Sequence, residues 1–106
     1  MKPIAKQGPN RDRIVGTLKR HERDLRVRGA RALYLFGSTA RGRATKSSDV
    51  DLFVDCYPGR RFSIVDLLKL RDYVQGLLRR NVDLLTRQGL HRLIRRRVEA
   101  DAIKIY

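Results

Sequence analysis

Residues 33–55 read LYLFGSTARGRATKSSDVDLFVD. The apolar run at 32–36 ends at Gly37, which is typical of a strand that is buried on both faces. A short helix beginning near Ser38 or Thr39 and a polar loop are expected next, followed by a second strand at 50–54. Because side chains alternate along a strand, its two faces would carry Val50, Leu52 and Val54 on one side, and Asp49, Asp51, Phe53 and Asp55 on the other.

Helical periodicity dominates on both sides of this stretch. One amphipathic helix is expected over residues 10–28, capped by Asn10 and stopped by Gly29. Ser63 and Asp66 resemble a capping box, and they would open the longest core-facing helix of the chain.

The C-terminal third adds further short elements. Residues 82–86 predict a third strand, in which Asp83 lies on the face opposite Val82 and Leu84. Residues 90–100 have helical spacing, and residues 103–106 alternate like a short terminal strand. Helices that alternate with short strands predict an α/β or α+β fold, with a small mixed β-sheet flanked by helices.

Length and composition indicate one soluble domain. A chain of 106 residues, 42% apolar and 34% charged, can form one modest core. We expect a flexible N-terminal arm at residues 1–9 and a single domain at residues 10–106. No apolar run approaches the roughly 20 residues that span a bilayer, and the N-terminus lacks the apolar core of a signal peptide. We therefore expect a cytoplasmic protein with no membrane partner.

The formal net charge of +14 is large for this length. Such a field attracts polyanions and fits a nucleic-acid or acidic-protein partner. The basic residues are spread along the whole chain, however, and a merely solvated basic surface explains the count equally well. Nucleic-acid binding is allowed by this composition and not required by it.

Cys56 and His21 are interpreted as structural residues. The single cysteine has no partner for an internal disulfide or a metal site, so we expect a small buried residue at the end of a strand. His21 falls on or beside the apolar stripe of its helix, and no partner stands at metal-ligand spacing, which indicates a packed or rim histidine.

Two carboxylates at the start of the second strand can share a cation. Asp49 and Asp51 point to the same face, with Cα atoms about 6.5 to 7 Å apart. Mg²⁺ prefers oxygen ligands of this kind, and a cation would relieve the repulsion between them. An Asp-x-Asp pair is common, but the chain has only eleven acidic residues, and three of them cluster here. The third, Asp55, is interpreted as structural or solvated.

The turn before these carboxylates has the features of a phosphate site. Gly37 lets the backbone approach a ligand closely, and Ser38 offers a hydroxyl and a backbone N–H. Arg41 would either contact a phosphate as a bidentate donor or brace the loop by pairing with a carboxylate. A phosphate turn close to a carboxylate pair predicts a site for a nucleoside triphosphate with metal ions.

Together these motifs resemble a known family. The pattern Gly37-Ser38-x-Ala40-Arg41-Gly42, five residues, and Ser48-Asp49-x-Asp51-Leu52 resembles the signature of the minimal nucleotidyltransferases, single-domain members of the DNA polymerase β-like nucleotidyltransferase superfamily. The resemblance covers nearly the whole chain and implies the nucleotidyltransferase fold. It also implies that Gly37 and Ser38 hold the phosphates of the nucleotide, that Asp49 and Asp51 bind two Mg²⁺ ions, and that Asp83 completes the site and helps to deprotonate the acceptor.

The same resemblance implies a reaction and a partner. Two-metal chemistry would activate an acceptor hydroxyl and steady the triphosphate, so that AMP passes from ATP to the acceptor and pyrophosphate leaves. Minimal nucleotidyltransferases commonly act as antitoxins that transfer AMP to a tyrosine of a HEPN ribonuclease toxin. We expect this chain to be such a protein adenylyltransferase, since 106 residues leave no room for a domain that would grip the acceptor.

Two other functions are compatible with the sequence. A non-catalytic module could neutralise a protein or an RNA by contact through its basic surface, although it would not need Asp49, Asp51 and Asp83. Nucleotidyl transfer to a small molecule or to an RNA end is the other alternative, which the missing second domain disfavours. Neither the base preference, the number of nucleotides transferred nor the oligomeric state follows from the sequence.

Overall fold

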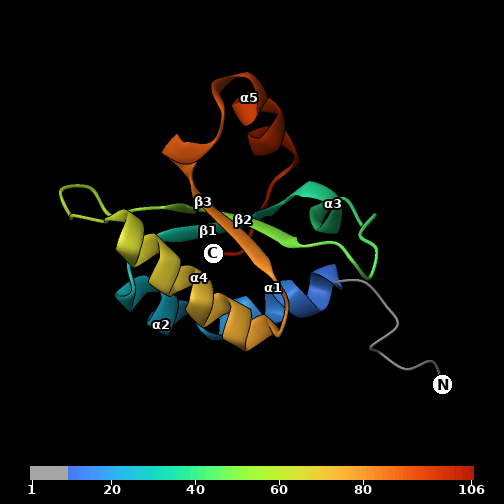
Figure 1. Ribbon diagram of the computed structural model, residues 1–106, viewed down its shortest axis with the longest axis horizontal. Helices are drawn as coiled ribbons and strands as arrows, with labels where there is room; N and C mark the ends of the chain where they lie inside the picture. Colours follow the sequence, from blue (N-terminus) through green and yellow to red (C-terminus); the bar gives the residue numbers. More distant parts are fainter. Residues whose placement is uncertain (1–9) are drawn as a thin grey trace.

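A four-stranded sheet crosses the centre of the domain, with its strands in the order β3-β2-β1-β4. The computed structural model describes residues 10–106 (Figure 1), so the arm expected at residues 1–9 lies outside the described residues. The strands are β1 (Ala32–Phe36), β2 (Val50–Asp55), β3 (Val82–Thr86) and β4 (Ile103–Lys104). β1 is antiparallel to both β2 and β4, whereas β2 and β3 are parallel. The prediction of a small mixed sheet is confirmed.

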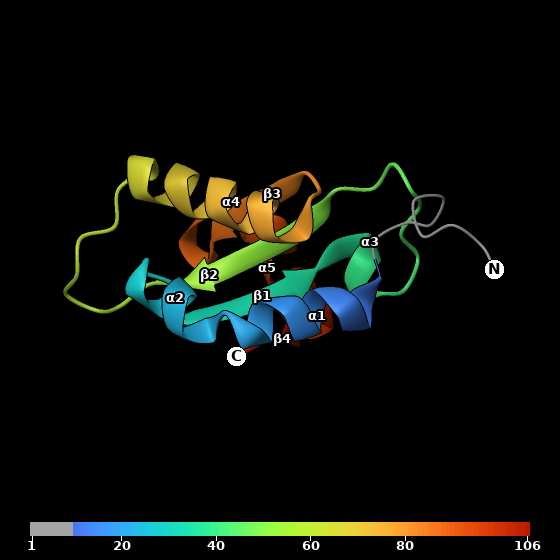
Figure 2. The same ribbon diagram turned by 90° about the horizontal axis from the view of Figure 1, so that it is seen from below.

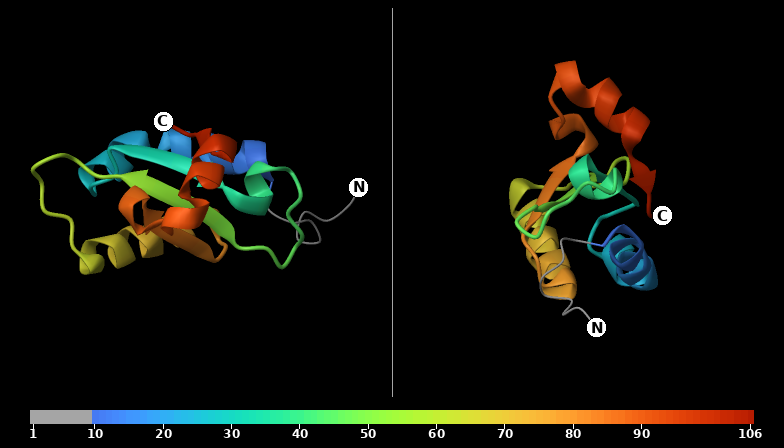
Figure 3. Two further views of the ribbon diagram at one scale, coloured as in Figure 1. Left: turned by 90° about the horizontal axis from the view of Figure 1, so that it is seen from above. Right: turned by 90° about the vertical axis from the view of Figure 1, so that its right-hand side faces the viewer.

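Helices cover both faces of this sheet. Figure 1 shows α1 (Arg11–Arg20), α2 (Glu22–Val27) and α4 (Ile64–Leu78) beneath it, and α5 (Arg92–Asp101) above it. Seen from below, α1 and α4 lie side by side across the same face (Figure 2). The short helix α3 (Gly37–Ala40) lies at one end of the sheet, between the two helical layers (Figure 3). The 3-10 turn η2 (Arg87–Gly89) connects β3 to α5.

The layer formed with α1 and α4 holds the apolar core. Its central side chains, on the sheet and on the helices, are at most 1% exposed: Leu35, Leu52, Val54, Leu18, Leu70 and Val74. On the other face the rings of Tyr34 and Phe53 stack with centroids 4.6 Å apart. The predicted alternation along β2 is therefore confirmed, because its aliphatic residues enter the core while Phe53 packs on the side of α5.

Two predicted helix caps are confirmed. The Oδ1 atom of Asn10 accepts the backbone N–H of Arg13 at 2.9 Å. The backbone N–H of Ser63 donates to Oδ2 of Asp66 at 2.8 Å, and the N–H of Asp66 donates to Oγ of Ser63 at 3.1 Å. Caps of this kind contribute about 1 kcal/mol each to helix stability.

The prediction of one continuous helix over residues 10–28 is wrong, because the helix breaks at His21. The ring Nδ1–H of His21 donates to the carbonyl of Thr17 at 2.8 Å, while its backbone N–H bonds to Leu18 at 3.1 Å. In a regular helix the Thr17 carbonyl would accept the backbone N–H of His21, so the side chain replaces the bond that continues the helix. His21 is half-buried, which confirms its interpretation as a packed or rim residue.

Two further boundaries differ from expectation. α3 begins at Gly37, just before the expected start, and β4 comprises only Ile103–Lys104. The N–H groups of Ile105 and Tyr106 both approach the carbonyl of Leu33, at 2.8 and 3.4 Å, so the regular ladder stops there. Both residues are nevertheless buried at the end of the chain.

Cys56 is half-buried directly after β2, less enclosed than expected. No helix within residues 10–106 is long and apolar enough to cross a membrane.

Candidate active site

Three chain segments meet at one end of the sheet. β1 ends where β2 begins, since the two are antiparallel, and Phe36 is paired with Asp51. β3 runs parallel to β2, and Asp51 is paired with Asp83. Gly37 directly follows Phe36, so the topology brings Gly37, Asp51 and Asp83 to one place. The right-hand view of Figure 3 looks onto this end, where α3 lies between the helical layers.

Gly37 packs against Asp51 on the side where other residues carry a side chain. Its φ angle is +77°, in the left-handed region that favours glycine. A Cβ at this position would collide with the Asp51 carboxylate and lie only 3.1 Å from its Cγ atom. A ligand that is held by the turn would therefore also meet the carboxylate.

Backbone hydrogen bonds close the turn that follows Gly37. The N–H of Arg41 donates to the carbonyl of Gly37 at 3.2 Å, and the N–H of Arg43 donates to that of Ser38 at 2.8 Å. The Arg11 side chain, from α1, donates to the carbonyl of Ala40 at 3.1 Å and ties the turn to the helical layer. These contacts fix the turn that carries the half-buried Ser38.

Desolvation, together with repulsion among the carboxylates, sets the electrostatics of this end. Asp51 is half-buried, and its desolvation is the main cause of its raised pKa. The negative charges of Asp83 and Asp49 raise this pKa further, and the positive charge of Arg41 opposes them. Asp49 and Asp83 are themselves exposed. The predicted carboxylates thus lie close enough to act on one another, and a cation among them would relieve the repulsion.

Arg41 acts on Asp51 without forming an ion pair. Its charge lowers the pKa of Asp51, yet within residues 10–106 its side chain makes no salt bridge to a carboxylate. Bracing of the loop by such a pair is therefore not observed in the described chain.

The donor atoms of this end suit a hard cation. Asp49, Asp51 and Asp83 supply carboxylate oxygens, which Mg²⁺ prefers to the nitrogen of His or the sulfur of Cys. In the described part of the chain, no three His, Cys, Asp or Glu residues form a group that could hold a metal ion. Asp51 and Asp83 share a register position, and Asp49 stands just before β2.

Asp55, at the other end of β2, has a different environment that the sequence analysis did not foresee. Arg87 donates to its two carboxylate oxygens at 2.6 and 3.0 Å, and the pair lowers the pKa of Asp55. Arg87 also pairs with Glu99 of α5. The interpretation of Asp55 as structural is confirmed, whereas nothing local in the sequence marks Arg87 as its partner.

The chain was compared with known proteins. Residues 17–105 match the nucleotidyltransferase domain family. The protein adenylyltransferase MntA of Thermococcus cleftensis is 36% identical over 80 residues, which cover 74% of this chain and 79% of that protein.

Solved structures share the fold. A chain in a toxin–antitoxin complex with AMP-PNP superposes with a TM-score of 0.70 at 20% identity, covering 87% of this chain and 72% of that one. A complex of tri-AMPylated Shewanella oneidensis HEPN toxin with its MNT antitoxin gives a TM-score of 0.65 at 17% identity, covering 91% and 71%. The family match, the identity to MntA and the common fold confirm the resemblance seen in the signature residues: this chain belongs to the nucleotidyltransferase domain family and is a minimal nucleotidyltransferase.

Proposed function

We propose that this chain transfers AMP from ATP to a tyrosine hydroxyl of a HEPN ribonuclease toxin, with Mg²⁺ as cofactor and release of pyrophosphate, and so acts as an antitoxin. The observation that carries the proposal is the register of the sheet. It aligns Asp51 with Asp83 and sets the glycine turn against the Asp51 carboxylate.

Each predicted site residue has a role in this proposal. Gly37 and Ser38 bind the ATP phosphates through backbone N–H groups and the hydroxyl, and Arg41 adds a charged donor. Asp49, Asp51 and Asp83 hold the Mg²⁺ ions, which supply charge neutralisation and a lowered pKa for the acceptor hydroxyl when bound. Asp83 lies on the outer side of Asp51, on edge strand β3, where it accepts the proton of the entering hydroxyl.

Two kinds of relatives support ATP as the nucleotide donor and a HEPN toxin as the acceptor. MntA, a relative by sequence, is a protein adenylyltransferase. The solved fold relatives include a toxin–antitoxin complex with an ATP analogue and an AMPylated HEPN toxin bound to its MNT antitoxin.

Mass spectrometry of the partner tests the proposal. A HEPN-domain ribonuclease toxin is incubated with this chain, ATP and Mg²⁺, and we expect the mass of one or more AMP groups on a tyrosine of the toxin. The Asp49→Ala/Asp51→Ala double variant is the control and should add none. A partner that gains no nucleotide from the wild-type protein would refute the transfer.

Neutralisation by contact alone is the second candidate, favoured by the net charge of +14. A cell-protection assay separates the two functions. If the Asp49→Ala/Asp51→Ala variant protects cells from the toxin as well as the wild type does, binding is sufficient and the carboxylates are not needed.

A further inference from the structure

A cavity of about 250 Å³, here called the α2–α4 cavity, opens at the end of the sheet opposite the candidate active site. It is lined by residues 27–29 before β1, by residues 60–62 after β2, and by Asp66, Lys69 and Leu70 of α4. The carboxylates and the glycine turn, by contrast, lie where β1 ends and β2 begins. Figure 2 shows α2 and the loop from β2 to α4 at one end of the domain, and α3 at the other.

Cations dominate the charged part of the lining. There are four of them, and all are exposed: Arg28, Arg60, Arg61 and Lys69. The one carboxylate of the lining, Asp66, already accepts the backbone N–H and the hydroxyl of Ser63 at 2.8 and 3.0 Å. The cavity therefore has an excess of positive charge that a negatively charged partner would neutralise.

Two of these arginines have a fixed position. The guanidinium of Arg28 lies 3.8 Å from the ring centroid of Tyr73, and that of Arg60 donates to the carbonyl of Val27 at 3.3 Å. Arg61 and Lys69, on the other hand, form no salt bridge within residues 10–106. Their charges can pair with a partner without breaking an ion pair of the fold.

Apolar side chains line the same cavity. Leu70 is 1% exposed and belongs to the core, Phe62 is half-buried, and Val27 is 69% exposed. The ring of Phe62 packs directly on Gly29, where a Cβ would collide with it. A large apolar side chain that enters the cavity would cover Val27 and contact Phe62, and its neighbours in the partner would meet the cations. An apolar anchor in a pocket with a polar rim is the usual centre of a protein interface.

The volume and the mixed lining distinguish between possible occupants. A cavity of about 250 Å³ is smaller than the roughly 300–1,000 Å³ of small-molecule pockets, so it has room for a side chain and not for a whole nucleotide. A nucleic-acid backbone would use the cations and leave the apolar walls without a partner. A second copy of this chain brings the same net charge of +14 and would be repelled. An acidic protein segment with an apolar side chain matches both parts of the lining.

We propose that the α2–α4 cavity is a docking site for a segment of a partner protein in which one large apolar side chain is flanked by aspartates or glutamates. The inference goes beyond the proposed function, because none of these residues is assigned to ATP, Mg²⁺ or the acceptor hydroxyl. A partner that docks here leaves the carboxylate end of the sheet open. The apolar anchor supplies affinity, and the cations select an acidic segment and speed its approach.

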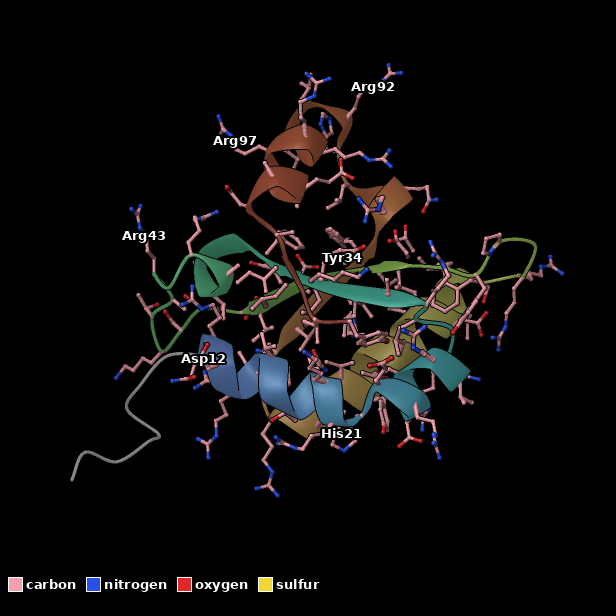
Figure 4. All side chains as sticks on the ribbon, turned by 180° about the vertical axis from the view of Figure 1, so that it is seen from behind. Asp12, His21, Tyr34, Arg43, Arg92 and Arg97 are labelled. Carbon is pink, nitrogen blue, oxygen red and sulfur yellow. The ribbon has the colours of Figure 1, made fainter. Side chains whose placement is uncertain are left out.

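Three exposed residues allow the two parts of the lining to be tested separately. The double variant Arg61→Gln/Lys69→Gln removes two charges, and Val27→Ser removes apolar surface and keeps every charge. The matched control is Arg92→Gln/Arg97→Gln, which removes the same number of charges from exposed positions of α5 (Figure 4). Helix α5 lies on the other face of the sheet (Figure 1), so this control measures the effect of net charge alone.

Fluorescence anisotropy measures docking of a labelled peptide in which one leucine stands between two runs of three glutamates. We expect Arg61→Gln/Lys69→Gln to raise the Kd at least about tenfold, and the α5 control to change it less than about twofold. Val27→Ser, and glycine in place of the leucine of the peptide, should each raise the Kd about threefold or more. No binding to the wild type, or equal weakening in the α5 control, would overturn the proposal.

Other ligands separate this docking site from its alternatives. Single-stranded RNA and vesicles of anionic phospholipid are titrated in the same way. If Arg61→Gln/Lys69→Gln weakens either of them while the glycine peptide binds as well as the leucine peptide, the cavity recognises charge alone and the proposal fails.

Nucleotide binding provides the last control. Mg²⁺ and a non-hydrolysable ATP analogue should raise the Tm of Arg61→Gln/Lys69→Gln as much as that of the wild type. A smaller rise in this variant would place the cavity in the nucleotide site and overturn the proposal. If the peptide binds as expected and no AMP reaches the toxin, the proposed function fails while the docking site stands.

Discussion

The two ends of β2 treat their carboxylates in opposite ways. Asp51 and Asp55 lie on the same face of one strand. Asp55 receives two N–H bonds from Arg87, which lower its pKa. Asp51 is desolvated beside Asp83 and Asp49, and its pKa is raised. The carboxylate of Asp55 is neutralised by an arginine of the same chain, whereas the carboxylate of Asp51 has no such ion pair among the described residues. A carboxylate of the second kind is typical of a binding site, and one of the first kind is typical of a structural ion pair.

The satisfied end also fixes α5 on the sheet. The guanidinium of Arg87 lies 4.9 Å from the ring centroid of Tyr34 and 5.0 Å from that of Phe53. It pairs with Glu99 of α5 as well as with Asp55. One arginine thus joins β2 to the helical layer above it, and Tyr34 lies between the sheet and that layer (Figure 4).

The largest effect is expected from Asp51→Asn. AMP transfer should fall by about 10³-fold or more, since the variant loses a charge that the metal and the transition state require. The free energy of unfolding without metal should stay unchanged or rise, because the repulsion from the neighbouring carboxylates is removed. Transfer rates and urea unfolding measure the two quantities. A loss of activity below about tenfold would contradict the assigned role.

Asp55→Asn should show the reverse pattern. We expect a loss of about 2–3 kcal/mol in the free energy of unfolding, since the side chains of Asp55 and Arg87 are only 14% and 24% exposed and Arg87 would lose its main partner. Transfer activity at low temperature, where the variant stays folded, should change little. Arg71→Gln is a suitable control, because its ion pair with Asp72 lies at the surface. Equal losses of unfolding free energy in both variants would show that the ion pair of Arg87 with Asp55 stabilises the fold no more than a surface pair does.

The two ends also predict opposite dependences of stability on pH. The stabilisation from Asp55 is present above the unfolded pKa of 3.8 and is lost as the pH falls through its lowered folded value. The contribution of Asp51 is present below 3.8 and is lost as the pH rises through its raised folded value. Relative to the wild type, Asp55→Asn should therefore be least stable at neutral pH, and Asp51→Asn should gain stability there. Urea unfolding in acid and at neutral pH measures both differences, and the same trend in both variants would contradict the account.

The smallest effect is expected at Thr39, in the turn beside Asp51. Thr39 is 1% exposed, and within residues 10–106 its Oγ1 atom has no hydrogen-bond partner. Replacing it by valine, which has nearly the same shape, should leave the free energy of unfolding unchanged or raise it by about 1 kcal/mol. A clear loss of stability in thermal unfolding would indicate that the hydroxyl is bonded after all.

The grouping of residues at the Asp51 end of β2 could be predicted from the sequence, whereas the ion pair of Asp55 with Arg87 at the other end could not. Gly37, Asp49 and Asp51 stand within one short stretch, and alternation along a strand is a local property that sorts its side chains by face. In a later strand the same alternation placed Asp83 on the face opposite Val82 and Leu84, and the family resemblance identified it as the third carboxylate of the site. Arg87, by contrast, lies 32 residues from Asp55 in the chain, and only the packing of the sheet brings the two together.

Other features depend on single contacts that no local pattern indicates. The break at His21 arises because its ring competes with the backbone for the carbonyl of Thr17. A cavity beside Asp49 is lined by both Lys46 and Arg79, although β2 and α4 separate these two residues in the chain. Hydrophobic periodicity describes one helix or strand at a time, so it does not predict contacts between residues of different elements.

The central claim is that the Asp51 end of β2 binds Mg²⁺ and a nucleotide. Thermal unfolding with Mg²⁺ and a non-hydrolysable ATP analogue tests this claim most directly. A ligand at 100 times its Kd stabilises the folded state by about 2.7 kcal/mol. We predict that Mg²⁺ and the analogue together raise the Tm of the wild type and of Asp55→Asn by similar amounts, and that they leave the Tm of Asp51→Asn unchanged. An equal rise in Asp51→Asn would contradict the claim.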